Sequence, residues 1–279
     1  MGTAIGYLAP GIWGLFMGAG FERIPAMRLA FGILAVLATI FMLVPAFGIN
    51  EKDYCEAQPG TSPVLKSLVT TFKNKDFRVF VLQDIIYFLG LTMFQTGLPF
   101  FVTSLLRFDE SMSMVMFVGL TAASLIFYPF ITKLAHKIGK KALVVIAFIG
   151  FVITFGFTGI CGPDLKLNIY VQAVLIVLLG SFPMAIFGIC PQAIVADIAQ
   201  SDEILTGENR SGMFYAARTF AMKFGQSAAM LIFTSLATIG AANGTGYRIV
   251  ALVAAGCCAL GGIIMKLFNE KRVLDVINK

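Results

Sequence analysis

The 279-residue sequence has few of the side chains from which proteins build catalytic and metal sites. It contains 1 histidine and 1 tryptophan, and charged residues make up only 13% of the chain. Its 5 cysteines show no paired spacing of the kind that ligates zinc or forms a disulfide framework. No spaced cluster of His, Cys, Asp or Glu and no Ser-His pair is evident. We therefore expect neither an enzyme nor a metal centre.

Apolar residues, in contrast, are abundant along the whole chain. Hydrophobic residues make up 58% of it, 27 are phenylalanines, and the mean hydropathy is +0.87. This composition lies outside the soluble range and predicts an all-α integral membrane protein. A net charge of +6 could indicate nucleic-acid binding in a soluble protein. Here the basic residues gather between apolar segments, so we expect no nucleic-acid partner.

About eight segments are apolar enough to be transmembrane helices. They are predicted at 4–20, 29–48, 79–106, 113–134, 142–161, 169–194, 213–241 and 249–268. The order predicts three parts: residues 1–48 with two spans, a polar linker at 49–78, and residues 79–279 with six spans and a short tail. Within the linker, 62–72 has a helical apolar pattern typical of a helix on the membrane surface.

The basic residues between the spans predict the orientation of the chain. The linker, the loop from Lys133 to Lys141 and the C-terminal tail all lie on one side of the predicted membrane and carry most of the lysines and arginines. This side is therefore predicted to be cytoplasmic, and both chain ends fall on it. The predicted location is the cell (cytoplasmic or inner) membrane.

Lys223 is the residue whose position needs the most explanation. It lies ten residues inside the span 213–241, roughly 15 Å deep at about 1.5 Å of rise per residue. A lysine at this depth costs about 2.5 to 3.5 kcal/mol on insertion. A side chain that extends about 6 Å toward the interface would leave its ammonium in the apolar layer. We therefore expect Lys223 to line a wet cavity between helices rather than to contact lipid.

Other polar residues in the spans leave two interpretations open. Asp84 lies roughly 8 Å from the end of its span, and either an interfacial position or a cavity role fits it. Direct pairing of Asp84 with Lys223 is not expected without intervening water. Four glutamines could hydrogen-bond a ligand or join helices to one another: Gln83, Gln95, Gln172 and Gln192.

The stretch between the spans 169–194 and 213–241 is the most polar connection, and Thr206-Gly207 supplies turn chemistry between two helices. Its charged residues and those that follow it are Asp197, Asp202, Glu203, Arg210 and Arg218. One interpretation is that the acids simply pair with Arg210 and Arg218 near one helix end.

The same stretch carries a resemblance to a known family. Ala196-Asp197-Ile198, the acidic pair Asp202-Glu203, Thr206-Gly207, Arg210, Gly212, Tyr215 and Lys223 resemble the glycoside-pentoside-hexuronide:cation symporters, the melibiose-permease group of the major facilitator superfamily. The segment 65–77 (LKSLVTTFKNKDF) and Tyr128-Pro129 with the loop 133–141 are also similar to this family. Two positions depart from the melibiose permease: Gly188 replaces an aromatic residue near the cavity, and Arg218 replaces an amide.

The resemblance implies a fold and a set of roles. It implies a major facilitator-type helix bundle, N-terminally truncated, with the last two helices of the N-terminal bundle, a central linker and a complete C-terminal bundle. Substrate binding or coupling is implied for Lys223 and Thr219, with Asp84, Gln83 and Gln95 as further candidates. A cytoplasmic gate is implied for Asp197, Asp202, Glu203, Arg210 and Arg218. The implied partners are a sugar or glycoside, a coupling cation (Na+ or H+), the lipid bilayer and the missing N-terminal helices, with no other cofactor.

Two functions remain as hypotheses. The first is the C-terminal portion of a cation-coupled sugar symporter that works by alternating access. The alternative is a membrane scaffold or half-transporter subunit without independent transport. An integral-membrane enzyme is disfavoured by the lack of catalytic clusters.

Overall fold

The computed structural model describes residues 2–49, 64–240 and 243–278. The chain divides into two compact units, Met1–Thr61 and Ser62–Lys279. The unit boundary falls within the predicted linker, whose residues 50–63 lie outside the described part of the chain. All regular secondary structure among the described residues is helical, as predicted.

The first unit consists of α1 (Gly2–Gly18) and α2 (Arg23–Gly48), which pack against each other. The small side chains of Ala26 and Ala30 are fully buried in this contact, and Trp13 meets Phe31 with ring centroids 6.1 Å apart. The rest of α2 exposes mostly large apolar side chains, as expected of a helix with a lipid-facing surface.

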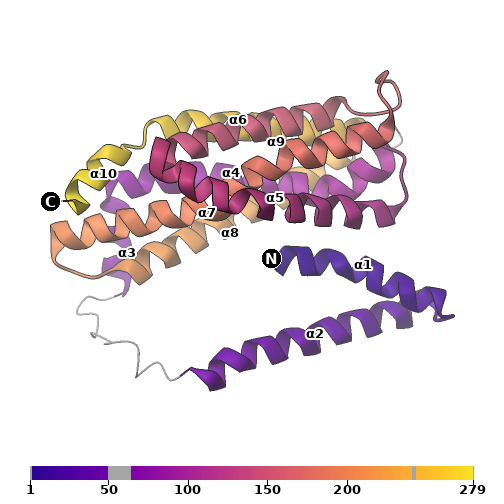
Figure 1. The fold of residues 1–279 in the computed structure, drawn as a ribbon, viewed down its shortest axis with the longest axis horizontal. Helices are drawn as coiled ribbons and strands as arrows, with labels where there is room; N and C mark the ends of the chain where they lie inside the picture. The colour runs from indigo at the N-terminus through magenta and orange to yellow at the C-terminus, as the bar shows by residue number, and fades with distance from the viewer. Residues whose placement is uncertain (1, 50–63, 241–242, 279) are drawn as a thin grey trace. The chain divides into compact units, whose positions relative to one another are not determined.

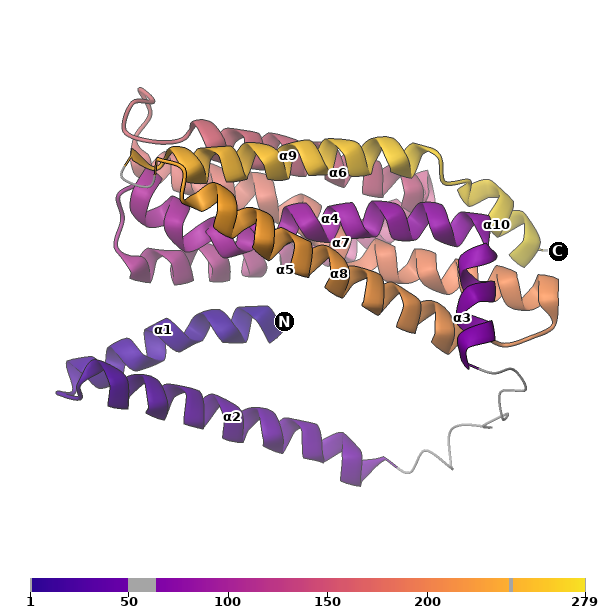
Figure 2. The ribbon, with the colours of Figure 1, turned by 180° about the vertical axis from the view of Figure 1, so that it is seen from behind.

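The second unit contains the remaining described helices (Figures 1 and 2). They are α3 (Val64–Lys73), α4 (Lys75–Phe100) with a π-helical end (Phe101–Leu105), α5 (Glu110–Ile138), α6 (Lys140–Ile160), α7 (Ile169–Thr206), α8 (Ser211–Ala237), α9 (Thr245–Lys266) and α10 (Glu270–Ile277). A helix is present where the sequence predicts one at 62–72: it is α3, which packs against α4 and α8, and its place on the membrane surface stays a prediction.

The helices of the bundle pack side by side in one continuous series. Extensive contacts join α8 to α4, α4 to α9, α9 to α6, α6 to α7, and α7 to α5. Helices α5 and α8 therefore lie at the two ends of this order, and the side between them has only smaller contacts, including those of α4 with α5 and α7 and of α7 with α8. We call this side the open face of the bundle.

Stacked aromatic rings hold the centre of the bundle together. Tyr87 of α4 stacks on Phe187 of α7 with ring centroids 3.7 Å apart, and Phe94 of α4 stacks on Phe155 of α6 at 4.1 Å. Each buried aromatic side chain of this size removes about 150 to 250 Å² from solvent or lipid contact. The central position of α4 is thus set by rings that reach two different neighbours.

A change of helix type follows Pro99 in α4. Proline has no backbone N–H and its ring clashes with the preceding turn, so the hydrogen-bond register is disturbed there. The chain continues as a π-helix from Phe101 to Leu105, and the ring of Phe101 occupies the space left by Gly97, where a β-carbon would lie 2.5 Å from Cζ.

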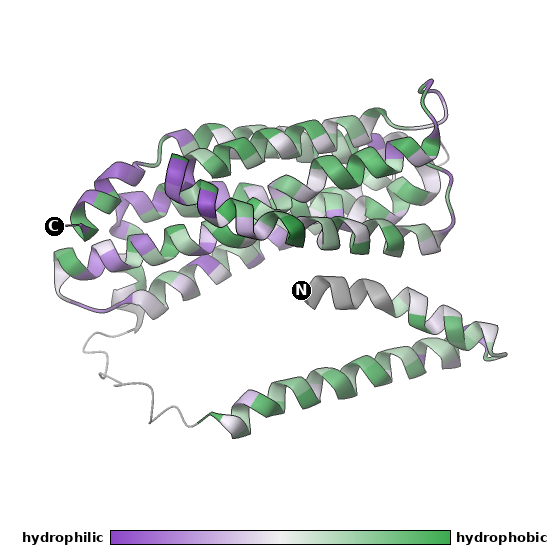
Figure 3. Ribbon diagram, viewed as in Figure 1, coloured by the Kyte–Doolittle hydropathy of each residue, from purple (hydrophilic) through white to green (hydrophobic). Residues whose placement is uncertain are grey.

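Polarity along the helices agrees with a membrane protein. Figure 3 shows apolar residues along most of α2, α6 and α9, with hydrophilic residues gathered on α10. Among the described helices, 6 are long and apolar enough to cross a membrane: α2, α4 with its π-helical end, α5, α6, α7 and α9. The other two predicted spans correspond to α1, which has only 17 residues, and to α8, whose middle contains Arg218, Lys223 and Gln226. Their membrane crossing stays a prediction.

Candidate functional site

The predicted site residues fall into two separate clusters and an exposed pair. One cluster lies inside the bundle between α4 and α8. The other lies at the end of the bundle where α3, the α7–α8 connection and α10 meet, which we call the linker end. The exposed pair consists of Lys223 and Thr219 on α8.

Asp84 and Arg218 form an ion pair inside the bundle. Arg218 donates from Nε to Asp84 Oδ2 at 2.9 Å and from Nη2 to Oδ1 at 3.4 Å. The Asp84 side chain is fully buried and that of Arg218 is only 9% exposed, with its Cζ 5.6 Å from the centre of the Phe80 ring. Asp84 is thus buried within the bundle, and both its interfacial position and its cavity role stay predictions. Arg218, which was predicted to be a gate residue, forms this interior pair, and its gate role stays a prediction.

Lys223, which the sequence predicts to line a wet cavity, lies at the surface of this unit. Lys223 and Thr219 both lie on the exposed surface of α8, and Lys223 makes no ion pair with the described residues. The buried cation of α8 is Arg218. Thr219 donates its hydroxyl to the backbone carbonyl of Tyr215 at 2.8 Å, one turn back on the same helix. The cavity-lining role of Lys223 stays a prediction.

The glutamines have three different environments. Gln83 is fully buried, and neither atom of its amide has a hydrogen-bond partner. Gln172 donates to the carbonyls of Gly162 and Leu167 and accepts from the Gly162 N–H, so it fastens the connection between α6 and α7. Gln95 lines a small interior cavity, and Gln192 is exposed on α7. The ligand-binding and helix-joining interpretations of the glutamines both stay predictions.

The interior cavity near Gln95 cannot hold a sugar. It has a volume of about 20 Å³ and lies between α4, α5, α6 and α7, with Phe94, Phe117, Thr154 and Met184 in its lining. About 10 to 15 Å³ is enough for one water, whereas ligand pockets occupy about 300 to 1,000 Å³. This cavity is therefore not the substrate site.

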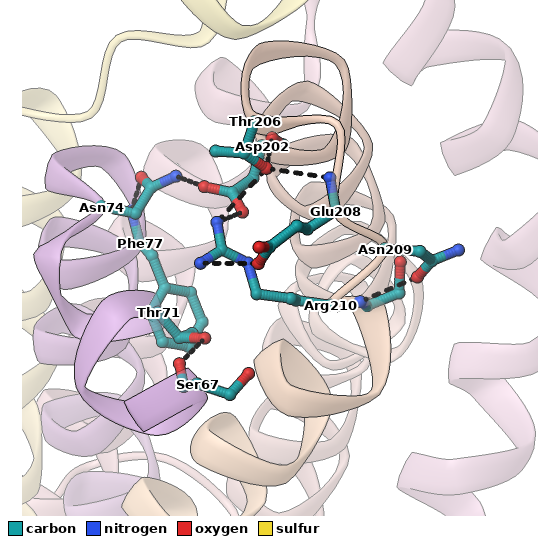
Figure 4. Close-up of polar contacts among 10 residues, drawn as sticks. Ser67, Thr71, Asn74, Phe77, Asp202, Thr206, Glu208, Asn209 and Arg210 are labelled. Atoms are coloured by element: carbon teal, nitrogen blue, oxygen red, sulfur yellow. Dashed lines mark hydrogen bonds and ion pairs between the residues drawn. The ribbon is translucent and has the colours of Figure 1, made fainter. Parts of the chain in front are cut away.

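The linker end contains a hydrogen-bonded cluster centred on Asp202 (Figure 4). Arg210 donates from Nη2 to Asp202 Oδ2 at 2.7 Å, and Asn74 donates from Nδ2 to Oδ1 at 3.1 Å. Asn74 also begins α4, because its side-chain oxygen accepts from the backbone N–H groups of Asp76 and Phe77. One carboxylate thus joins the α7–α8 connection to the boundary between α3 and α4.

The local sequence explains how this cluster forms. Thr206 ends α7, and Gly207 adopts φ 72°, a left-handed conformation that glycine takes without steric cost. The predicted turn at Thr206-Gly207 is confirmed, and it returns the chain so that Arg210 reaches back to Asp202. Glu208 approaches Arg210 at 3.9 Å, and Glu203 makes no ion pair among the described residues.

A second set of charged contacts joins the other helices at the linker end. Lys140, the first residue of α6, pairs with Asp197 of α7 at 2.5 Å. Arg272 of α10 pairs with Asp76 of α4 at 2.6 Å. Glu270 of α10 accepts from the backbone N–H of Lys140 at 2.7 Å and of Lys141 at 3.1 Å. Sequence reasoning missed Asn74, Lys140 and Glu270 because their partners lie 57 to 130 residues away in the chain.

The pairing interpretation of the acidic stretch is therefore confirmed for Asp202 with Arg210, and Asp197 pairs with a lysine. The ion pairs among the described residues of the second unit all have both partners within that unit. A gate role for Asp197, Asp202, Glu203 and Arg210 stays a prediction.

Comparison with known proteins adds the family to this geometry. The model of the MFS/sugar transport protein family matches residues 1–249. The chain belongs to this family. Its family is one of multi-pass membrane transporters of the major facilitator type and not of enzymes, as the sequence predicted.

The chain is also similar to a distant curated relative. An uncharacterized symporter from Synechocystis sp. is 25% identical over 166 residues, which is 58% of this chain and 29% of the relative. The chain thus spans less than a third of the length of this relative. The comparison supports a transport function for this member of the MFS/sugar transport family and leaves its substrate and coupling ion as proposals.

Proposed function

We propose that this chain forms the C-terminal part of a cation-coupled symporter for a sugar or glycoside, working by alternating access. The observation that carries the proposal is the arrangement of charge on α8. Arg218 is neutralised by Asp84 inside the bundle, while Lys223 and Thr219 point outward from the same helix. A cation without a partner on an apolar helix needs water or a ligand beside it.

The exposed surface of α7 supports the same proposal. On α7, one exposed helical stripe at four-residue spacing has small or amide side chains at Gly188, Gln192, Ala196 and Gln200, and it ends at Ile204 near the linker end. Further toward the other end, the exposed residues of α7 are large and apolar, including Leu178 and Val174. This change of polarity along α7 fits a polar path for the substrate that begins near the middle of the helix.

In the proposed protein, Lys223 and Thr219 contact the substrate or the coupling groups, and the linker-end pairs belong to the cytoplasmic gate. Lys223 offers three donors, and Thr219 offers a hydroxyl for a sugar. The linker end and the C-terminus lie on the cytoplasmic side of the cell membrane, because the loops there are rich in lysine and arginine. The coupling cation is Na+ or H+, and further helices complete the path on the side facing Lys223.

Counterflow in reconstituted vesicles tests the proposal. The probes are radiolabelled methyl galactoside, methyl xyloside and methyl glucuronide, measured with and without sodium and with a pH gradient. We expect exchange of at least one glycoside and its accumulation only with an ion gradient. Absence of exchange for all probes would favour the alternative, a half-transporter subunit without transport of its own.

Substitution of Lys223 by alanine should abolish uphill accumulation, since coupling requires its charge. Lys271→Ala is the matched control, because Lys271 is also exposed but lies on α10. Thr219→Ala should weaken glycoside binding, whereas Thr234→Ala, which removes a similar backbone-bonded hydroxyl on the same helix, should not. Normal accumulation by Lys223→Ala would exclude that lysine from the coupling site.

A further inference from the structure

One side of α5 changes from apolar to basic as the helix approaches the linker end. The large side chains of Ile126 and Phe130 are 67% and 63% exposed. Lys133 and Lys137 follow them along the helix, and both are exposed. Because these residues are three or four positions apart, their side chains share one face of the helix. We call this face, formed by Ile126, Phe130, Lys133 and Lys137, the α5 stripe.

The α5 stripe lies on the side of α5 that faces away from α7, the main neighbour of this helix. Tyr128 marks the opposite side, because a β-carbon on Gly188 of α7 would lie 2.5 Å from the Tyr128 hydroxyl oxygen. At about 100° of rotation per residue, the stripe side chains lie roughly 140 to 200° from Tyr128 around the helix. The apolar part of the stripe is therefore placed to contact acyl chains of the bilayer.

The charge of the α5 stripe is not balanced by the protein. Lys133 and Lys137 make no ion pair among the described residues. Helices α5 and α7 both run toward the linker end (Figure 1), so Asp197 of α7 lies near the level of Lys137. The Asp197 carboxylate, however, already pairs with Lys140. The two stripe lysines thus leave their positive charge available to a partner outside the chain.

The spacing along α5 matches the boundary between acyl chains and headgroups. At about 1.5 Å of rise per residue, Lys133 and Lys137 lie roughly 4.5 and 10.5 Å beyond Phe130. Phe130 can lie against acyl chains while the lysine ammonium groups extend to the level of the phosphates. The linker end is the side predicted to be cytoplasmic, and the cytoplasmic leaflet attracts basic residues through its anionic lipids.

We propose that the α5 stripe binds one anionic phospholipid, with the phosphate between Lys133 and Lys137 and an acyl chain along Phe130 and Ile126. Residues four apart on a helix have β-carbons about 5 to 6 Å from each other, so both ammonium groups can donate to one phosphate. Phosphatidylglycerol has no cation in its headgroup and leaves its whole negative charge to the lysines. The choline of phosphatidylcholine offsets that charge and weakens the attraction.

Native mass spectrometry of the full chain in detergent tests the site. The protein is titrated with phosphatidylglycerol and, separately, with phosphatidylcholine. Attraction to an anionic surface is worth about 1 kcal/mol per basic residue, or about 5-fold in affinity. The double variant Lys133→Gln/Lys137→Gln should therefore bind phosphatidylglycerol roughly 30-fold more weakly and phosphatidylcholine as the wild type does. Replacement of both lysines by arginine should keep the preference for phosphatidylglycerol.

Lys166→Gln/Lys271→Gln is the matched control, because it lowers the net charge equally. Both of its lysines are exposed, lie outside the α5 stripe and make no ion pair among the described residues. The control should bind phosphatidylglycerol as the wild type does. Phosphatidylglycerol should also raise the melting temperature of the wild type and of the control, but not that of the stripe variant. In lipid-free detergent all three should melt alike.

Three outcomes would overturn the proposal. Equal loss of phosphatidylglycerol binding in the two double variants would show a general effect of net charge. Equal binding of phosphatidylglycerol and phosphatidylcholine by the wild type would show that the lysines do not select an anionic headgroup. Competition by glycerol phosphate at the same concentration as the lipid would show a site for free phosphate, without a contribution from acyl chains at Phe130 and Ile126.

Discussion

Arg218 of α8 donates to the buried carboxylate of Asp84 on α4 at 2.9 Å, across 134 positions of sequence. This contact fixes the rotation of α8 against α4. Gly225, two turns further along α8, allows the same two helices to approach closely, since a β-carbon there would lie 2.6 Å from the Ile85 carbonyl. Helix α8 is therefore held at two points, and its opposite face, with Lys223, is left exposed.

The first prediction concerns the Asp84–Arg218 pair. Asp84→Asn leaves the guanidinium buried without a counter-charge, and the free energy of unfolding should fall by about 3 to 5 kcal/mol. Thermal unfolding in detergent micelles measures the change. Glu203→Gln, a carboxylate without an ion pair among the described residues, should unfold like the wild type. Asp84→Asn with Arg218→Gln should recover much of the loss, and no recovery would contradict a charge effect.

The second prediction concerns Asn74, which begins α4 and also contacts Asp202. Asn74→Ala should cost about 0.5 to 2 kcal/mol through the lost helix cap. It should also increase amide hydrogen exchange in two places: the first turn of α4 and the α7–α8 connection. Asn269→Ala removes the cap of α10 in the same way, since Asn269 accepts from Arg272 N–H, and should affect α10 alone. Exchange confined to α4 in Asn74→Ala would show that the contact with Asp202 is not stabilising.

The third prediction concerns the corner between α5 and α6. Gly139 has φ 88°, and a β-carbon there would lie 2.8 Å from Glu270 Oε2. Gly139→Ala is therefore strained by its backbone and by this clash, with a loss of stability of about 1 kcal/mol or more. Thermal unfolding of Gly156→Ala, in the middle of α6 and in open space, is the control and should show no loss. Equal melting temperatures for the two variants would argue against the role assigned to Gly139.

The fourth prediction concerns the thiol of Cys161, which follows α6 and is 1% exposed. Burial raises the pKa of Cys161 to about 11, and nearby Arg248 offsets only part of this. Because the raised pKa keeps the thiol protonated, the reactive thiolate is roughly a hundredfold scarcer at pH 7.5 than for an ordinary cysteine. Alkylation followed by peptide mass spectrometry should be slow and should rise about tenfold per pH unit up to pH 10.

Asp164→Cys provides the comparison for Cys161, because position 164 is exposed in the same connection. Its alkylation rate should be fast at pH 7.5 and should level off near pH 9, where an ordinary thiol is largely ionised. A Cys161 rate that levels off at the same pH would show that its pKa is not raised.

Much of the fold was predictable because it depends on local composition. Long apolar runs indicated the helices. The basic linker indicated the division into two groups of spans, and Thr206-Gly207 indicated the turn before α8. The sequence could not show which face of α8 is buried, because α8 has apolar residues on every face. Phe214 and Phe233 are buried, whereas Phe220 and Phe224 are 71% and 62% exposed. Arg218 and Lys223 lie about 140° apart around the helix, so the face of α8 that packs into the bundle determines which of the two cations is buried.

The partners of the charged residues could not be predicted for a related reason. Asp84 with Arg218, Asn74 with Asp202 and Lys140 with Asp197 each join elements distant in the chain, and one sequence contains no signal for such pairs. The contact between Tyr128 and Gly188 is of the same kind. Glycine is frequent in membrane helices, so a single glycine in α7 did not indicate which side chain lies over it.

The bond between Glu270 and the first N–H groups of α6 also has a consequence for biosynthesis. The two partners are 130 residues apart, so α6 is synthesised and inserted into the membrane long before Glu270, which supplies the capping carboxylate, has been translated. Until then its leading amide groups must be hydrated or shielded by the insertion machinery. In a chain truncated before residue 270, the first amide groups of α6 would stay uncapped. Cellular quality control would recognise this exposed helix start and degrade the product.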